Sequence, residues 1–90
     1  MINVTERARK ALKRILTAHV DLPQGRLRLL DRGQGNLGLG LDIEMPGDEL
    51  LKYDGTTILV VEQGLATNLK HVTLDVEDDT EEAELVIYRG

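Results

Sequence analysis

The sequence contains no cysteine, serine, phenylalanine or tryptophan. The absence of cysteine excludes disulfide bonds, thiolate metal ligands and cysteine nucleophiles, and the absence of serine excludes a serine nucleophile. Tyr53 and Tyr88 are the only aromatic residues, so the hydrophobic core must be aliphatic. Because two common nucleophiles of covalent catalysis are missing, we expect that the protein is not an enzyme.

Long apolar runs are also missing. No segment approaches the ~18–20 apolar residues of a membrane-spanning helix, and no apolar signal-peptide segment follows Met1. The net charge of −5 disfavours nucleic-acid binding, because affinity for a polyanion comes mostly from neutralising its phosphates. The 90 residues suffice for one small domain, residues 1–90. We therefore expect a cytoplasmic single-domain protein that binds neither membranes nor nucleic acids.

Positive charge is concentrated near the N-terminus. Residues 1–32 contain eight Lys or Arg and three Asp or Glu, whereas residues 33–90 contain three and thirteen. The spacing of apolar residues predicts an amphipathic helix over residues 5–20, with Thr5 as its N-cap. Its polar face carries Arg7, Lys10 and Arg14. These residues either bind an acidic partner protein or form an ordinary solvated helix face.

After this helix, apolar residues recur at every second position, which is typical of strands with one buried face. Strands are predicted at 26–29, 37–43, 50–53, 57–61, 72–76 and 83–88, with a short helix within 62–69. The run 57–61 is apolar throughout and should lie centrally in a sheet. Asp54-Gly55 is a strong hairpin signal. The sequence therefore predicts an α+β, sheet-dominated fold with one N-terminal amphipathic helix and a second short helix.

Four glycines fall within the eight residues from Gly33 to Gly40. The segment satisfies the pattern G-x-G-x-x-G, but no helix is predicted after it. A dinucleotide fingerprint requires that helix, because the helix N-terminus binds the pyrophosphate. The glycines instead indicate a loop that needs positive φ or close backbone approach. We expect no cofactor at this loop.

Histidines and carboxylates offer a second kind of site. His19 lies on the apolar face of the predicted helix, and His71 lies just before a predicted strand. Seven of the ten residues from Asp75 to Glu84 are acidic, without the spacing of a calcium loop. They form either a solvated hairpin that protects a sheet edge or, together with the histidines, a metal or small-ligand site. We expect no metal site, since no spacing joins these residues.

Read end to end, the chain resembles the HesB/IscA-like family of A-type iron–sulfur carriers. The matching segments occur in order along the chain: Val4-Thr5-Glu6-Arg7-Ala8, Leu27-Arg28-Leu29 before Gly33-Gln34-Gly35, Leu39-Gly40-Leu41-Asp42, Pro46-Gly47-Asp48-Glu49, Asp54-Gly55 before Ile58-Leu59-Val60-Val61, the short helix ending at Leu69, and Leu74-Asp75. The resemblance covers nearly all 90 residues and implies the fold of that family.

The resemblance also implies which residues are missing. Members of that family carry a Gly-Cys-Ser-Gly loop and a C-terminal Cys-Gly-Cys, whose cysteines hold iron or a cluster. The loop cysteine falls at or beside Gln34, within Gly33-Gln34-Gly35, and no Cys-Gly-Cys occurs among Val86–Gly90. We therefore expect a cysteine-less, degenerate member that works by protein–protein contact or self-association. The alternatives are a metal or small-ligand site of histidines and carboxylates, and a cluster-free accessory role in iron–sulfur assembly.

Overall fold

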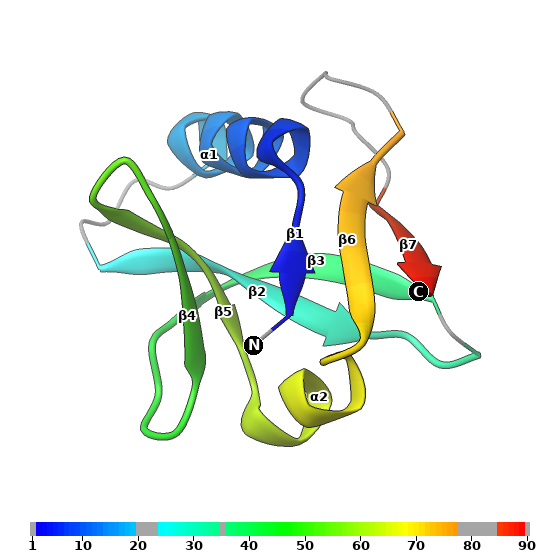
Figure 1. The fold of residues 1–90 in the computed structure, drawn as a ribbon. Coiled ribbons are helices and arrows are strands. Elements are labelled where there is room, and N and C mark those ends of the chain that lie inside the picture. The colour runs from blue at the N-terminus through cyan, green and yellow to red at the C-terminus, as the bar shows by residue number, and fades with distance from the viewer. Residues whose placement is uncertain (1, 20–23, 35, 78–84, 90) are drawn as a thin grey trace.

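The computed structural model describes residues 2–19, 24–34, 36–77 and 85–89, without the side chains of His19 and Arg89. Two helices and seven strands follow one another along the chain in Figure 1. They are β1 (Asn3–Val4), α1 (Glu6–His19), β2 (Gly25–Asp31), β3 (Leu37–Ile43), β4 (Glu49–Tyr53), β5 (Thr56–Val61), α2 (Gln63–Asn68), β6 (Val72–Val76) and β7 (Leu85–Arg89). The predicted α+β, sheet-dominated fold with two helices is confirmed.

The strands form two sheets. One has the order β3-β2-β5-β4, in which β2 is antiparallel to β3 and parallel to β5, and β4 is antiparallel to β5. The other has the order β1-β6-β7, with β1 parallel and β7 antiparallel to β6. The apolar strand β5 lies inside its sheet, as its sequence predicts. The sequence pattern does not predict β1, because two residues are too few to show a period.

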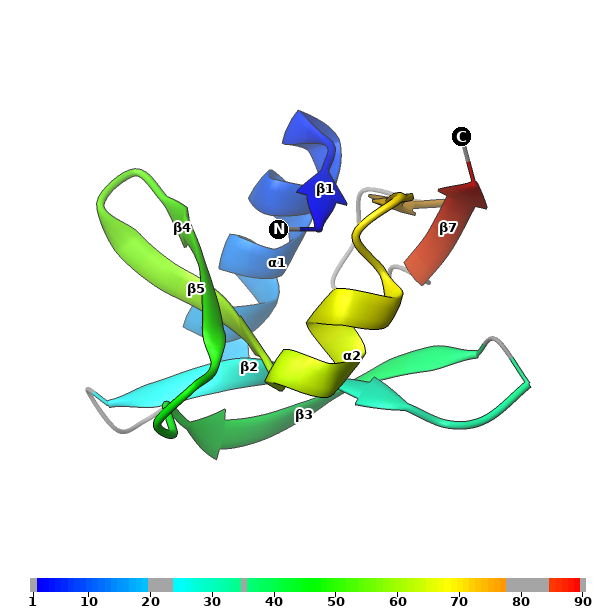
Figure 2. The ribbon, with the colours of Figure 1, turned by 60° about the horizontal axis from the view of Figure 1, so that its bottom comes forward.

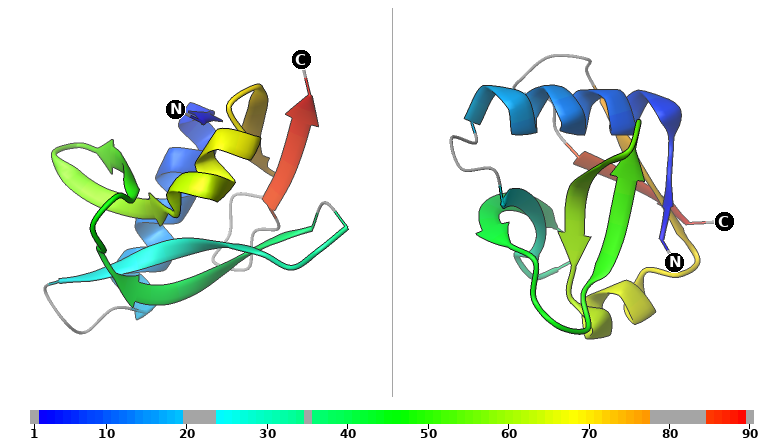
Figure 3. Two further views of the ribbon diagram at one scale, coloured as in Figure 1. Left: turned by 90° about the horizontal axis from the view of Figure 1, so that it is seen from below. Right: turned by 90° about the vertical axis from the view of Figure 1, so that its left-hand side faces the viewer.

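Helix α1 joins the two sheets, since it contacts strands of both. Its N-terminus is capped by Thr5, whose hydroxyl oxygen accepts a hydrogen bond of 3.1 Å from the amide of Ala8. Its apolar face is buried at Ala8, Ala11, Leu12, Ile15 and Leu16. Helix α2 lies at the opposite end of the molecule from α1, as Figure 1 and the right-hand view of Figure 3 show.

The core is aliphatic, as the composition requires. Its largest fully buried side chains come from α1 and from strands of both sheets: Leu12, Leu27, Leu29, Ile58, Leu59, Val60, Val61, Leu74 and Val76. The hairpin formed by β2 and β3 extends beyond this core, and its turn projects from the body of the molecule in Figure 2 and in the left-hand view of Figure 3. The glycine-rich loop therefore lies at an exposed extremity. No helix of the described residues is long and apolar enough to cross a membrane.

Candidate functional site

The tip of the β2–β3 hairpin is the position where the family resemblance places a cysteine. Gly33 and Gln34 both adopt positive φ, +88° and +55°. The turn is closed by hydrogen bonds from the amide of Asn36 to the Gly33 carbonyl and from the amide of Arg32 to the Asn36 carbonyl, both 2.9 Å. A Cβ at Gly33 would meet nothing within 4 Å, so its positive φ, rather than crowding, favours glycine there. Gln34 is exposed.

This hairpin tip does not provide a metal site by itself. Across residues 2–19, 24–34, 36–77 and 85–89, no group of three or more His, Cys, Asp or Glu side chains could hold a metal ion. A glutamine amide is a neutral donor, whereas iron–sulfur clusters are bound chiefly by thiolates. The turn at Gln34 therefore presents an exposed amide and no thiolate. Gly35, the third residue of the predicted loop, lies outside the described residues.

Of the side chains in the alternative metal site, the structure describes His71, Asp75 and Glu77. His71 is exposed in the turn after α2, as predicted. Asp75 is already engaged, because its Oδ1 accepts hydrogen bonds from the Thr5 hydroxyl (2.7 Å) and the Val76 amide (2.8 Å), and Arg7 lies 3.2 Å from its Oδ2. The side chain of His19 and residues 78–84 lie outside the described residues. Asp75 therefore helps to hold the start of α1 to β6.

The basic surface predicted on α1 is present, and part of it forms an ion pair within the molecule. Arg7, Lys10 and Arg14 are all exposed. The Arg7 guanidinium pairs with Asp75, so its charge already serves an intramolecular contact. A partner-binding role for these residues stays a prediction.

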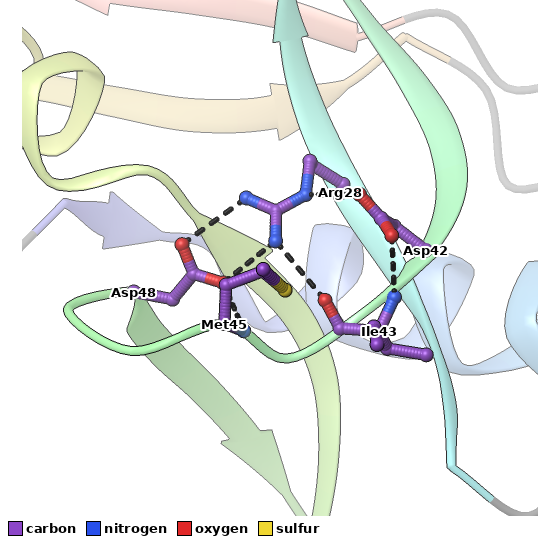
Figure 4. Close-up of polar contacts among 5 residues, drawn as sticks. All are labelled: Arg28, Asp42, Ile43, Met45 and Asp48. Carbon is purple, nitrogen blue, oxygen red and sulfur yellow. Dashed lines mark hydrogen bonds and ion pairs between the residues drawn. The ribbon is translucent and has the colours of Figure 1, made fainter.

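A polar cluster at the end of β3 was missed by reasoning from the sequence (Figure 4). The Arg28 guanidinium donates to both carboxylate oxygens of Asp48 (3.1 and 2.6 Å), to Asp42 Oδ2 (2.8 Å) and to the Ile43 carbonyl (3.1 Å). Asp48 Oδ2 also accepts from the Met45 amide at 2.8 Å. The Asp48 side chain is 4% exposed and that of Arg28 13%. No sequence signal joins these residues, which lie 14 and 20 positions apart.

The Arg28 cluster fixes the course of the chain from β3 to β4. The guanidinium lowers the pKa of Asp48, an effect that burial opposes and the Met45 amide reinforces. The pKa of Asp42 is lowered chiefly by the Ile43 amide and then by Arg28. Both carboxylates therefore remain charged near neutral pH, and the segment between them is held at both ends.

Acid is expected to weaken the fold through these carboxylates. Because the pKa of Asp48 is lower in the folded than in the unfolded chain, its contribution is complete above its ordinary value of 3.8. That contribution is lost as the pH falls through the lower folded value. Urea unfolding measured from neutral pH down to about pH 2 should show decreasing stability below about pH 4. In Asp48→Asn the decrease should be smaller, and an unchanged decrease would contradict this role.

An apolar surface lies beside the Arg28 cluster. We call Leu41, Ile43 and Met45 the β3 apolar strip; these side chains are 57%, 48% and 49% exposed. An open groove of about 350 Å³ adjoins the strip and is lined by Ile15, Leu27, Leu39, Gly40 and Leu41. Leu37 and Leu39, the preceding apolar residues of β3, pack against the core. The apolar side chains of β3 are thus packed against the core in the first half of the strand and exposed in the second half.

A second open groove, of about 750 Å³, lies between the end of β2 and α2. Its polar lining residues include Arg28, Asp31, Glu62 and Asn68. Both Glu62 carboxylate oxygens are occupied as the N-cap of α2, where they accept from the amides of Gly64 (3.0 Å) and Leu65 (3.1 Å). Two polar residues of this lining, Arg28 and Glu62, therefore already serve the fold.

Neither a protein-family model nor a curated protein sequence matches this chain. Solved structures do match it. A protein of Aquifex aeolicus, determined by solution NMR, is 20% identical with a TM-score of 0.73 over 99% of this chain and 91% of that chain. The crystal structure of IscA with the [2Fe-2S] cluster is 21% identical with a TM-score of 0.61 over 99% and 85%.

The crystal structure of Escherichia coli SufA, a protein involved in biosynthesis of iron–sulfur clusters, is 16% identical with a TM-score of 0.61 over 98% of this chain and 79% of that chain. At these identities the matches establish the fold. The predicted IscA-like fold is confirmed over nearly the whole chain, and it is combined here with a sequence that has no cysteine.

Proposed function

We propose that this chain, which has the fold of IscA and SufA, is a non-enzymatic protein that acts by contact with another protein chain and without holding an iron–sulfur cluster. The IscA crystal structure contains a [2Fe-2S] cluster, whereas this sequence contains no cysteine. Thiolates are the usual ligands of such clusters, and histidine replaces them only in part. Gln34 stands at the predicted cysteine position and offers only an amide.

The β3 apolar strip carries the proposal of a protein contact. Three large apolar side chains lie within five residues, each about half exposed, next to an open apolar groove. Neighbouring apolar residues exposed together on a small protein mark a surface for another macromolecule. The Arg28 cluster holds the strand end that presents them, so the surface is fixed before any partner arrives.

The shared fold supports a second candidate, a cluster-free accessory role in iron–sulfur assembly. SufA is involved in the biosynthesis of iron–sulfur clusters. In this candidate the exposed Lys10 and Arg14 dock an acidic assembly protein, with Arg7 contributing while it remains paired with Asp75. A cytoplasmic location fits both candidates.

Anaerobic reconstitution with iron and sulfide tests the absence of a cluster. We expect iron bound far below one atom per chain and no visible absorption band, because the chain supplies no thiolate. IscA, treated identically, is the positive control. Stoichiometric iron together with a visible chromophore in this protein would overturn the proposal.

A further inference from the structure

Strand β3 is the last strand of its sheet. One side of it pairs with β2 along all seven residues, from Leu37 opposite Asp31 to Ile43 opposite Gly25. Among the described residues, no strand pairs with its other side. Figure 2 and the left-hand view of Figure 3 show β3 at the border of the molecule. The unpaired amides and carbonyls of such an edge are a template for another strand.

The sequence of β3 is suited to pairing with itself. In an antiparallel pair of two copies with the twofold axis at Gly40, Leu37 lies opposite Ile43 of the second copy, and Leu39 lies opposite Leu41 of the second copy. All four pairs across the axis are apolar and share the face that carries the groove, because residues directly opposite each other lie on the same face of a sheet. The exposed Leu41 and Ile43 are thereby covered.

The opposite face of β3 is complementary in charge. There, Gly38 lies opposite Asp42 of the second copy, and the Arg32 side chain crosses the space above Gly38, where a Cβ would clash with its Nε. Arg32 is exposed, and none of its side-chain nitrogens makes a hydrogen bond or ion pair among the described residues. The Asp42 side chain is 48% exposed despite its contact with Arg28. The symmetric pair therefore juxtaposes Arg32 and Asp42 twice.

We propose that two copies of this chain associate through an antiparallel β3–β3 pair centred on Gly40, closed by two ion pairs between Arg32 and Asp42. This inference rests on the proposed function and names its partner as a second copy. An isologous contact of this kind closes on itself and leaves no free edge at β3. A register centred on Asp42 is disfavoured, because it would oppose two carboxylates.

Single-cysteine variants test the register, since the sequence contains no other cysteine. In a pair centred on Gly40, two copies of Gly40→Cys face each other within disulfide reach. In Asn36→Cys and Glu44→Cys, which keep both Arg32 and Asp42, the two cysteines lie about 26 Å apart along the strands, beyond the ~7 Å that a disulfide spans. After mild oxidation, non-reducing electrophoresis should show a crosslinked dimer for Gly40→Cys and at least a tenfold slower reaction for the other two. Equal rates in all three, or the fastest rate at position 36 or 44, would overturn the register.

Sedimentation equilibrium over a dilution series tests the association itself with cysteine-free variants. We expect a dimer for the natural sequence and a monomer for Leu41→Glu, which places a charge in the paired face. Tyr88→Glu is the matched control, because Tyr88 is equally exposed, at 57%, but lies on β7. It should leave the dimer unchanged.

A natural sequence that stays monomeric overturns the pairing, and so does a dimer that Tyr88→Glu abolishes and Leu41→Glu does not. The second result leaves protein contact in place on a different surface. Cluster uptake in the reconstitution experiment is a separate measurement, and it overturns the proposed function whatever the oligomeric state. The failures of the two proposals are thereby distinguishable.

Discussion

Replacing Arg28 with methionine is expected to lower the free energy of unfolding by about 3 kcal/mol. Methionine keeps an aliphatic stem, so the lost free energy of unfolding comes mainly from the polar contacts of the guanidinium. Without the guanidinium, the Asp48 carboxylate, whose side chain is 4% exposed, keeps only the Met45 amide as a partner within the described part of the chain. A buried charge that loses its partner costs more than the pair contributes when intact. Chemical denaturation near neutral pH measures the loss.

The same measurement on Asp48→Asn and on the double variant Arg28→Met/Asp48→Asn gives the coupling free energy between Arg28 and Asp48. Once the carboxylate is gone, Arg28→Met should cost clearly less, which gives a positive coupling between the two positions. Lys10→Met is the control for loss of one positive charge, since Lys10 is exposed on α1, and its effect should stay within about 0.5 kcal/mol. A loss for Arg28→Met as small as that of Lys10→Met would contradict a structural role of the cluster.

Local periodicity predicted most of the helices and strands, because each periodic pattern involves only residues that are close together in the sequence. The helix predicted over 5–20 is α1 (Glu6–His19), and the alternating segment 37–43 coincides with β3. The Asp54-Gly55 turn joins β4 and β5, with both residues at positive φ. The predicted final strand at 83–88 corresponds to β7 (Leu85–Arg89), and its first two residues lie outside the described ones.

The parts that sequence reasoning missed depend on contacts between distant positions. The Arg28 cluster joins β2 to a turn 20 residues away, and no period or motif encodes that distance. Alternation in β3 indicates which side chains share a face, but the depth of burial depends on what covers that face. Along β3, Leu39 packs against the core, whereas Leu41, two residues further on, is 57% exposed. The candidate surface therefore depends on tertiary contacts that the alternation of β3 does not encode.

Four leucines lie side by side across the larger sheet, one on each strand: Leu41, Leu27, Leu59 and Leu51. Leu59 of β5 is fully buried, with Leu27 and Leu51 on the two neighbouring strands as its register partners. Leu59→Ala should lower the free energy of unfolding by about 3 kcal/mol, through lost burial and a residual cavity. In a domain of this size that is a large share of the total, and we expect the Tm to fall by about 15 °C. Thermal and urea unfolding measure both quantities.

Leu41→Ala is the matched control, because Leu41 lies in the same row on the other side of Leu27 and is 57% exposed. In dilute, monomeric protein it should cost less than about 1 kcal/mol, since little of its side chain leaves water on folding. At higher concentration, where the dimer forms, the two variants should differ in the opposite sense. Leu41→Ala weakens the dimer, and Leu59→Ala does not. Equal losses of stability in dilute protein would mean that β3 is covered as deeply as β5, which contradicts an open strip.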